Sequence, residues 1–282
     1  MTSPFEQTVP SGLRDLVRDA ATPASSRIGN YLLDGDTNFA ADRAAAQQLL
    51  KVLPAAGLDA RTNRGFRRRA LRFLLDRGVR QFLDLGAGIP IPFDTVHEVV
   101  HACDPFAQVI YVDHDPLVVE HTQFVLAQVP VGVVHADLRS PGAVFGNATV
   151  FNRLDLSQPV GLLMTAVGHF VSEADGLPGI IAAYRAVLPP GSFLVLSHAT
   201  AAELTPGQAL GAIEVYDRTA TPLTLRTPEQ IAGLFGRFVL LPPGEDAQPA
   251  VVRVGEWRWT DGQKAPDDRA RGLYGGVGYL PG

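Results

Sequence analysis

The sequence predicts an α/β protein built on a doubly wound, mostly parallel seven-stranded sheet, with a helical extension at its N-terminus. Two observations support this prediction. Beyond residue 80, apolar runs of about four to six residues recur, and segments typical of helix or loop separate them. Before residue 77 the pattern is helical instead and rich in Ala, Leu and Arg. Short apolar runs spaced in this way are typical of buried parallel strands.

The N-terminal extension contains two well-marked helices. One is predicted from Asn38 to about Val52. The second is predicted from about Ala60 to Asp76, and Gly78 follows it in the position of a C-cap glycine.

The domain organisation follows from this change of pattern. Residues 1–24 are expected to be a poorly ordered segment, and residues 25–282 a single domain. Within that domain we expect residues 25–77 to form a helical lid or extension and residues 78–282 a Rossmann-like core.

The strands of the core are predicted at seven apolar runs. A helix is expected to start at Thr227, because Thr as N-cap, Pro228 at the first helical position and Gln230 two residues later form a capping box. Residues 242–271 are polar, contain Pro and Gly, and are predicted to form a loop. The predicted strands are Gln81–Leu85, Val109–Val112, Val131–His135, Val160–Thr165, Phe193–Leu196, Phe238–Leu241 and Leu273–Tyr279.

The composition excludes several chemistries. Of the 24 basic residues only Lys51 and Lys264 are lysines, and neither has the sequence context of a P-loop. The single cysteine, Cys103, excludes an intrachain disulfide, a four-cysteine zinc site and a three-cysteine iron–sulfur cluster. The net charge of −5 argues against a nucleic-acid partner.

No membrane partner is expected either. The longest apolar stretch, Val160–Val167, is far shorter than the ~20 residues of a membrane span. Because no secretory signal is recognisable, a cytoplasmic location is the default expectation.

Glycines follow the first predicted strand, at the edge where sheets of this kind bind ligands. Gly86, Ala87 and Gly88 allow a tight turn and a close approach of the backbone to a ligand. Ile91 stands where the third glycine of a dinucleotide fingerprint would fall, so a pyrophosphate is seated less favourably on the next helix. This favours an adenosyl ligand without phosphates over NAD.

Acidic residues follow the second and third predicted strands. Asp113, next to His114, can accept hydrogen bonds from both hydroxyls of a ribose. Asp137, next to Leu138, can accept from the exocyclic amine of adenine, which only donates. The alternative is that both acids merely cap the helices that follow them.

Further motifs extend over most of the chain. They are Asn30–Gly35, Asn38–Arg43, Asn63-Arg64, Phe82–Gly86, Val96–Val99, Tyr111–Asp113, Ala136–Arg139, Val195–His198 and Tyr274–Gly278. With these segments the chain resembles the actinobacterial S-adenosylmethionine-dependent methyltransferase family formerly described as a domain of unknown function. The resemblance implies a class I methyltransferase fold and S-adenosyl-L-methionine as cofactor. The chain departs from the family pattern at Gly29-Asn30, where the family usually has a Tyr-Asp pair.

Further candidate residues lie outside the glycine turn and the two acids. Asn30 and Tyr31 belong to a segment expected to close over the cofactor. Asn63 and Arg64 are candidates for holding its methionine carboxylate, because an Arg fork or a helix N-terminus suits a carboxylate.

The segment after the fourth strand is expected to face the transferred methyl group. Ala166 is predicted to contact the cofactor, and His169 is the candidate general base. The alternative for His169 is that it only shapes the pocket.

The segment His97–His101 reads H-E-x-x-H, which on a helix can bind zinc with Glu98 as base. It lies between the first two predicted strands, on a helix expected to pack against the sheet. Asp104 and Ala107 occupy the places where further ligands of a longer zinc motif would fall. We therefore predict no metal site.

The sequence thus predicts an S-adenosylmethionine-dependent methyltransferase that acts on a small-molecule acceptor, since the short loops between strands suit a small molecule. Methyl transfer from a sulfonium needs no lysine adduct, thiolate or metal cluster, which agrees with the composition. Three alternatives remain open: a non-catalytic adenosyl-binding protein, an NAD-dependent oxidoreductase and a zinc-dependent hydrolase.

Overall fold

The computed structural model describes residues 21–258 and 267–282. Most of the segment 1–24 that was predicted to be poorly ordered, and part of the predicted loop 242–271, therefore lie outside the described residues. Within the described ranges, no helix combines the length and apolar character that a membrane crossing requires.

A single mixed sheet forms the centre of the molecule, in the order β3-β2-β1-β4-β5-β8-β6, with β7 also paired to β8. Neighbours among β1 to β5 are parallel, whereas β8 runs antiparallel to β5, β6 and β7. The strands are β1 (Gln81–Leu85), β2 (Gln108–Asp113), β3 (Gly132–His135), β4 (Gly161–Thr165), β5 (Phe193–Ala199), β6 (Val239–Leu240), β7 (Val252–Arg253) and β8 (Leu273–Tyr279).

All seven predicted strands are present. The two-residue strand β7 lies in the segment predicted to be a loop, and it is too short to carry a periodic signal. The predicted helix start at Thr227 is confirmed: its hydroxyl accepts from the Gln230 N–H, and the Gln230 side chain accepts from the Thr227 N–H. Gly78 has the positive φ, 80°, expected of a residue that ends a helix.

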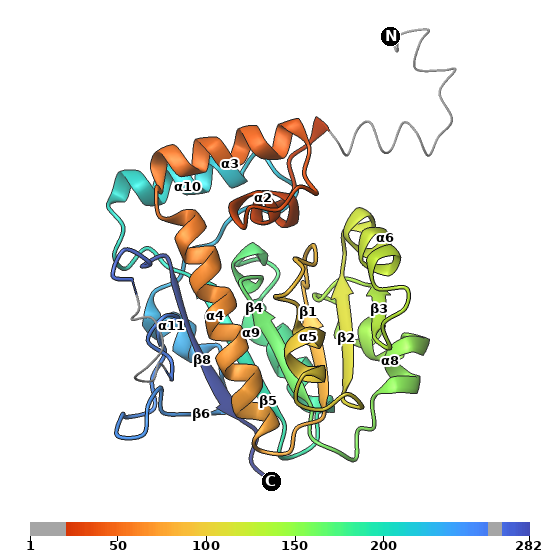
Figure 1. The fold of residues 1–282 in the computed structure, drawn as a ribbon. Helices are drawn as coiled ribbons and strands as arrows, with labels where there is room; N and C mark the ends of the chain where they lie inside the picture. Colours follow the sequence, from red (N-terminus) through yellow and green to blue (C-terminus); the bar gives the residue numbers. More distant parts are fainter. Residues whose placement is uncertain (1–20, 259–266) are drawn as a thin grey trace, which may run out of the picture.

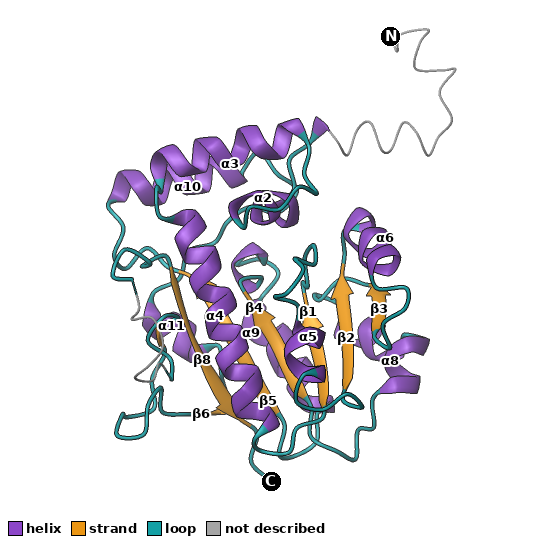
Figure 2. Cartoon of the chain, in the orientation of Figure 1, coloured by secondary structure: helices purple, strands orange, loops and turns teal. Residues whose placement is uncertain are grey.

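Helices cover both faces of the sheet (Figure 2). Because successive side chains of a strand point to opposite faces, Phe82 belongs to an apolar cluster with residues of α4 and α5, whereas Leu83 belongs to a second cluster with residues of α7, α8, α9 and α11. The helices are α2 (Ser25–Leu32), α3 (Ala40–Val52), α4 (Ala56–Leu75), α5 (Val96–His101), α6 (Pro116–Val125), α7 (Pro141–Gly146), α8 (Ala148–Arg153), α9 (Leu177–Val187), α10 (Pro206–Tyr216) and α11 (Pro228–Gly233), with a short 3₁₀ turn η2 (Gly168–Phe170).

Helices α2, α3 and α10, here called the roof, lie across the carboxyl ends of the parallel strands (Figure 1). They share an apolar cluster with the start of α4, which includes Ile28, Leu49, Ala56, Ala212 and Tyr216. Helix α4 begins in this cluster and continues down one face of the sheet (Figure 1). It therefore connects the roof to the core.

Candidate functional site

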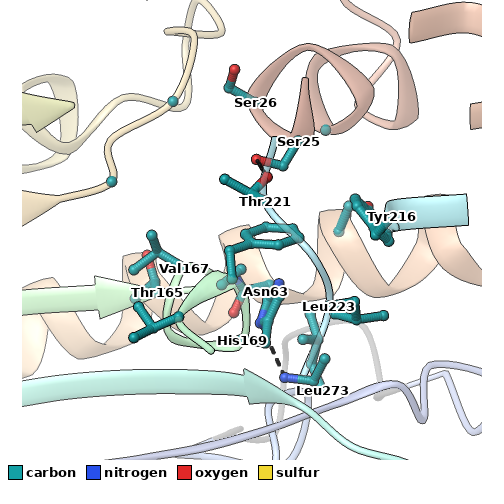
Figure 3. A pocket seen from close by; sticks show the side chains of 18 of the residues that line it. Ser25, Ser26, Asn63, Thr165, Val167, His169, Tyr216, Thr221, Leu223 and Leu273 are labelled. Atoms are coloured by element: carbon teal, nitrogen blue, oxygen red, sulfur yellow. Dashed lines mark hydrogen bonds between the residues drawn. The ribbon is translucent and has the colours of Figure 1, made fainter. Parts of the chain in front are cut away.

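A cavity of about 660 Å³ lies between the strand ends and the roof. One end, here called the strand end, is lined by the loops that follow β1 to β4. The other, here called the roof end, is lined by the roof helices, the start of α4, the loops around residues 199–204, 220–225 and 272–273, and Phe170, which follows β4 but packs against the roof cluster. In Figure 3, Thr165 and Val167 lie on one side of His169, and Tyr216, Leu223 and Leu273 lie on the other.

The turn after β1 depends on two glycines, each with a φ of +65°. A Cβ on Gly86 would lie 2.1 Å from Cγ2 of Val167, whereas a Cβ on Gly88 would meet nothing within 4 Å. Gly86 is thus required by the protein's own packing, and Gly88 leaves open space beside the backbone. Ala87, between them, also lines the cavity.

Asp113 at the end of β2 is buried, with an exposed fraction of 7%. Its Oδ2 accepts the Gly88 N–H at 2.9 Å, and its Oδ1 accepts the Asp115 N–H at 3.0 Å. Burial raises the pKa of this carboxyl. The next helix is capped by Asp115, which accepts the Leu117 N–H, so the alternative that Asp113 caps that helix is wrong.

Asp137 after β3 lies at the cavity and is held by Arg139, whose guanidinium Nε and Nη2 both donate to its carboxylate. Burial raises the pKa of Asp137, but the hydrogen bonds from Arg139 outweigh it and keep the pKa below its usual value. The N-cap of the following helix is Ser140, so the capping alternative is wrong for Asp137 as well.

Helix α4 brings two arginines to the strand end. Arg67 lies with Nη1 at 3.9 Å from Oδ2 of Asp84, a carboxyl in β1 that is 1% exposed. Burial raises the pKa of Asp84 to about 6. Arg64 lines the cavity, and its nearest carboxylate contact is 3.9 Å, from Nε to Oδ2 of Asp94. Burial lowers the pKa of Arg64 to about 9, so an anionic group in the cavity would stabilise its cation.

Asn63 joins α4 to the ends of β4 and β5. The hydroxyl of Ser197 donates to Asn63 Oδ1 at 2.6 Å and accepts the Ala166 N–H at 2.9 Å. Ala166 has a φ of +54°, a conformation that costs a non-glycine residue on the order of 1–2 kcal/mol. These hydrogen bonds fix the backbone that enters the cavity after β4.

His169 in η2 is buried at the centre of the cavity, where its Nδ1 accepts the Ala199 N–H at 3.2 Å (Figure 3). The imidazole proton is therefore on Nε2, and the ring can donate but has no free lone pair. Burial, together with the neighbouring His198 and Arg226, holds the pKa of His169 well below its usual value. The base role remains a prediction, and it would require the Ala199 hydrogen bond to break.

The structure gathers all but one of the predicted site residues around this cavity. The exception is Tyr31, whose hydroxyl is within 3.4 Å of Gln47 on the outer side of α2. Consecutive residues of a helix point about 100° apart, so Asn30 faces the cavity and Tyr31 does not. The predicted residues that line it are Asn30, Asn63, Arg64, Gly86, Ala87, Gly88, Asp113, His114, Asp137, Leu138, Ala166 and His169.

Sequence reasoning missed several lining residues. Asp59 lies on α4 four residues before Asn63, a spacing that places both on one helix face and could have identified it. No local signal could have identified Ser25 and Thr221, which are joined by a hydrogen bond of 2.9 Å between residues far apart in the chain (Figure 3).

The H-E-x-x-H segment forms α5, and its side chains have structural partners. His97 Nδ1 lies 2.9 Å from the Tyr111 hydroxyl, and His101 Nε2 lies 3.0 Å from the Ala107 carbonyl. Glu98 forms a capping box with Thr95 at the start of the helix. In the part of the chain that the structure describes, no group of three or more His, Cys, Asp or Glu side chains is arranged to hold a metal ion.

Comparison with known proteins identifies relatives over almost the whole chain. A family model described as S-adenosyl methyltransferase matches residues 14–281. The structure of a candidate methyltransferase from Thermobifida fusca YX is 33% identical, with a TM-score of 0.84, and the match covers 98% of this chain and 99% of that one. A DUF574 family protein from Streptomyces avermitilis MA-4680 is 32% identical, with a TM-score of 0.84 and coverage of 93% and 99%.

More distant structures share the fold alone. The CurJ carbon methyltransferase is 16% identical, with a TM-score of 0.53, and the match covers 100% of this chain and 72% of that one. A search of curated proteins found no significant match. Because the family model and the two closely similar structures span nearly the full chain, the protein belongs to the S-adenosyl methyltransferase family, has the class I methyltransferase fold and uses S-adenosyl-L-methionine as its cofactor.

Proposed function

We propose that the protein transfers a methyl group to a small, largely apolar molecule bound at the roof end of the cavity. The observation that carries this proposal is the contrast between the two ends of one cavity. The strand end has glycine backbone, three arginines and several carboxylates, whereas the roof end is lined mainly by aliphatic and aromatic side chains. A cavity of about 660 Å³ is in the size range of small-molecule sites.

The cofactor is proposed to lie across Gly86–Gly88, with its ribose hydroxyls donating to Asp113 and its adenine amine to Asp137. The open space at Gly88 supports this placement, because a side chain there would fill the path of a ligand. The methionine carboxylate is proposed to bind Arg64, whose guanidinium has no carboxylate oxygen closer than 3.9 Å among the described residues. These residues fit the group chemically.

The other predicted residues are proposed to complete the binding surface. Asn30, Asn63, His114, Leu138 and Ala166 would contact the cofactor. When bound, S-adenosyl-L-methionine supplies a methyl group already activated by the positive sulfur. The protein's main contribution is then to hold the acceptor in line with it, and positioning of this kind can supply roughly 7–11 kcal/mol.

We propose that His169 shapes the centre of the cavity and donates a hydrogen bond from Nε2. Its Nδ1 lone pair is already used by Ala199, and its pKa lies well below the usual value, which supports this role over that of a base. The lid over the site is proposed to be the predicted extension 25–77 together with α10, since α10 shares its apolar cluster with α2 and α3.

Titration calorimetry with S-adenosylhomocysteine tests the cofactor placement. The wild type is expected to bind, and Asp113→Ala to weaken binding by roughly 10- to 150-fold, because hydrogen bonds to a charged group contribute about 1.5–3 kcal/mol. Asp76→Ala, at an exposed position after α4, is the control and should leave the affinity unchanged. No binding to the wild type at millimolar ligand, or an unchanged affinity of Asp113→Ala, would contradict the placement.

A further inference from the structure

The roof end of the cavity contains one charge. Among the described residues that line it, Asp59 is the only one with a charged side chain. Its neighbours around this end are apolar or uncharged: Leu32, Leu33, Leu49, Leu53, Ala56, Ala60, Phe170, Thr200, Leu204, Ala212, Tyr216, Leu223, Leu225 and Leu273. A lone carboxylate in such surroundings is costly unless something pairs with it.

The protein holds this carboxylate in place without neutralising it. Oδ1 of Asp59 accepts the Gly272 N–H at 3.0 Å. A Cβ on Gly272 would lie 2.6 Å from Oδ2, so only glycine at this position allows the carboxylate to sit where it does. Among the described residues, no cationic side chain forms an ion pair with Asp59. Burial raises its pKa to about 6, as expected for a carboxyl without a cationic partner.

The position of Asp59 on α4 relates it to the proposed cofactor site. Asp59, Asn63 and Arg67 are spaced four residues apart and lie on one face of the helix. Arg67 contacts Asp84 at the strand end, and Asn63 contacts Ser197 at the middle of the cavity. With a rise of about 1.5 Å per residue, Asp59 lies roughly 6 Å beyond Asn63 along the helix axis, away from the strand end.

We propose that the methyl acceptor is a small, largely apolar amine, and that Asp59 binds its ammonium group and accepts the proton that the nitrogen loses before methylation. This inference rests on the proposed function, because it places the acceptor at the roof end. The aromatic rings of Phe170 and Tyr216, with centroids 5.1 Å apart, line the cavity and pack with the apolar cluster of the roof, and aromatic rings attract cations. A half-buried carboxylate in apolar surroundings selects a cation over a neutral or anionic molecule of similar shape.

The chemical balance is simple. The acceptor enters as an ammonium, and one proton passes from its nitrogen to the carboxylate of Asp59, which frees the nitrogen lone pair. The nitrogen then forms a bond to the methyl carbon while the bond between that carbon and sulfur breaks, and S-adenosylhomocysteine is released. The product is a methylated ammonium, and the proton on Asp59 leaves to solvent. A carboxyl with a raised pKa is a stronger base than an ordinary one, which suits this role.

The test is titration calorimetry on the protein saturated with S-adenosylhomocysteine. The probes are 2-phenylethylamine, tryptamine and hexylamine, each compared with the alcohol of the same carbon skeleton. At least one amine is expected to bind about tenfold or more tightly than its alcohol, and Asp59→Asn to remove that preference. The substitution keeps the size of the side chain and an oxygen that can accept the Gly272 N–H.

The control variant is Asp34→Asn, since Asp34 is an exposed acid between α2 and α3 that pairs with Arg61 outside this cavity. It should keep the amine preference. Three results would overturn the proposal: no amine in the panel binds, the alcohols bind as tightly as the amines, or Asp59→Asn retains the preference. Failure of the proposed function is distinct, because the wild type would then not bind S-adenosylhomocysteine in the first titration.

Discussion

The two ends of the cavity are built in different ways. The strand end is formed by loops that leave adjacent parallel strands, so the register of the sheet fixes where its residues lie; Leu85, for example, pairs with Val112 one residue before Asp113. The roof end is formed by helices and loops from distant parts of the chain, joined mainly by a small apolar cluster. The proposed cofactor contacts thus depend on the main sheet, and the proposed acceptor contacts depend on the packing of the roof.

The largest effect expected from this difference is on the free energy of unfolding, when a glycine is replaced by alanine beside the strand end and in the roof. Gly86→Ala should lower the free energy of unfolding by roughly 2–5 kcal/mol, because a left-handed φ and an overlap with Val167 add together. Gly211→Ala in α10 overlaps only side-chain atoms of Val52 and gains about 1 kcal/mol of helix propensity, so its net effect should stay within about 1 kcal/mol. Urea unfolding measures both.

Gly88→Ala is the control for the first effect. It has the same φ as Gly86 but open space around it, so only the conformational cost of roughly 1–2 kcal/mol should remain. If Gly86→Ala and Gly211→Ala lower the free energy of unfolding by the same amount, the strand end is no more rigidly packed than the roof.

A pH-dependent effect is expected at the strand end from Asp84. Burial raises the pKa of this carboxyl to about 6 in the folded protein, well above the usual value of an aspartate, so the folded state favours the protonated carboxyl. The stability contributed by this group is complete below pH 4 and is lost as the pH rises through 6. Relative to Asp84→Asn, the wild type should therefore lose on the order of 2–3 kcal/mol of unfolding free energy between pH 4 and pH 7.

Urea unfolding of both proteins at the two pH values gives this difference, with Asp76→Asn as an exposed control. An equal difference between wild type and Asp84→Asn at pH 4 and pH 7 would show that the buried carboxyl does not titrate in this range.

Two arginines of α4 allow the effect of a lost cofactor contact to be compared with the effect of a lost contact in the roof. Arg64 lines the cavity, whereas Arg61 pairs with Asp34 near the surface. Arg64→Ala should weaken the binding of S-adenosylhomocysteine by roughly 10- to 100-fold, since it removes a charged partner of the carboxylate. Arg61→Ala should leave the affinity unchanged. Calorimetry that finds equal losses for both variants would mean that the carboxylate binds elsewhere.

The smallest effect is expected at Asp137. Arg139 already donates to both of its carboxylate oxygens, and an asparagine keeps one oxygen that can accept from the adenine amine. Asp137→Asn should therefore weaken S-adenosylhomocysteine binding only about two- to fivefold, or about 0.5–1 kcal/mol. A loss of affinity as large as that of Asp113→Ala would show that the negative charge of Asp137 contributes strongly to cofactor binding despite its hydrogen bonds with Arg139.

Sequence alone predicts the strand end far better than the roof end. The glycine turn and the acids after β2 and β3 are local patterns, and the sheet converts each into a fixed position. Tyr31 was predicted beside Asn30 but faces away, because the direction of a helical side chain depends on how the helix is docked. Ser25 and Thr221 were not assigned to the site, since their place in it arises from a contact between segments that are far apart in the chain.

Because α4 is continuous, it limits which sequence changes can alter the set of acceptors that fit the cavity. One unbroken helix of 20 residues carries the side chains that face both ends of the cavity. Substitutions in α3, α10 or the loops of the roof can reshape the space for an acceptor while the distance along α4 stays the same. An insertion of one residue between Asp59 and Asn63 would instead rotate one end about 100° relative to the other. With the acceptor at the roof end, as proposed, new acceptors are most readily accommodated by replacing roof residues while the length of α4 stays unchanged.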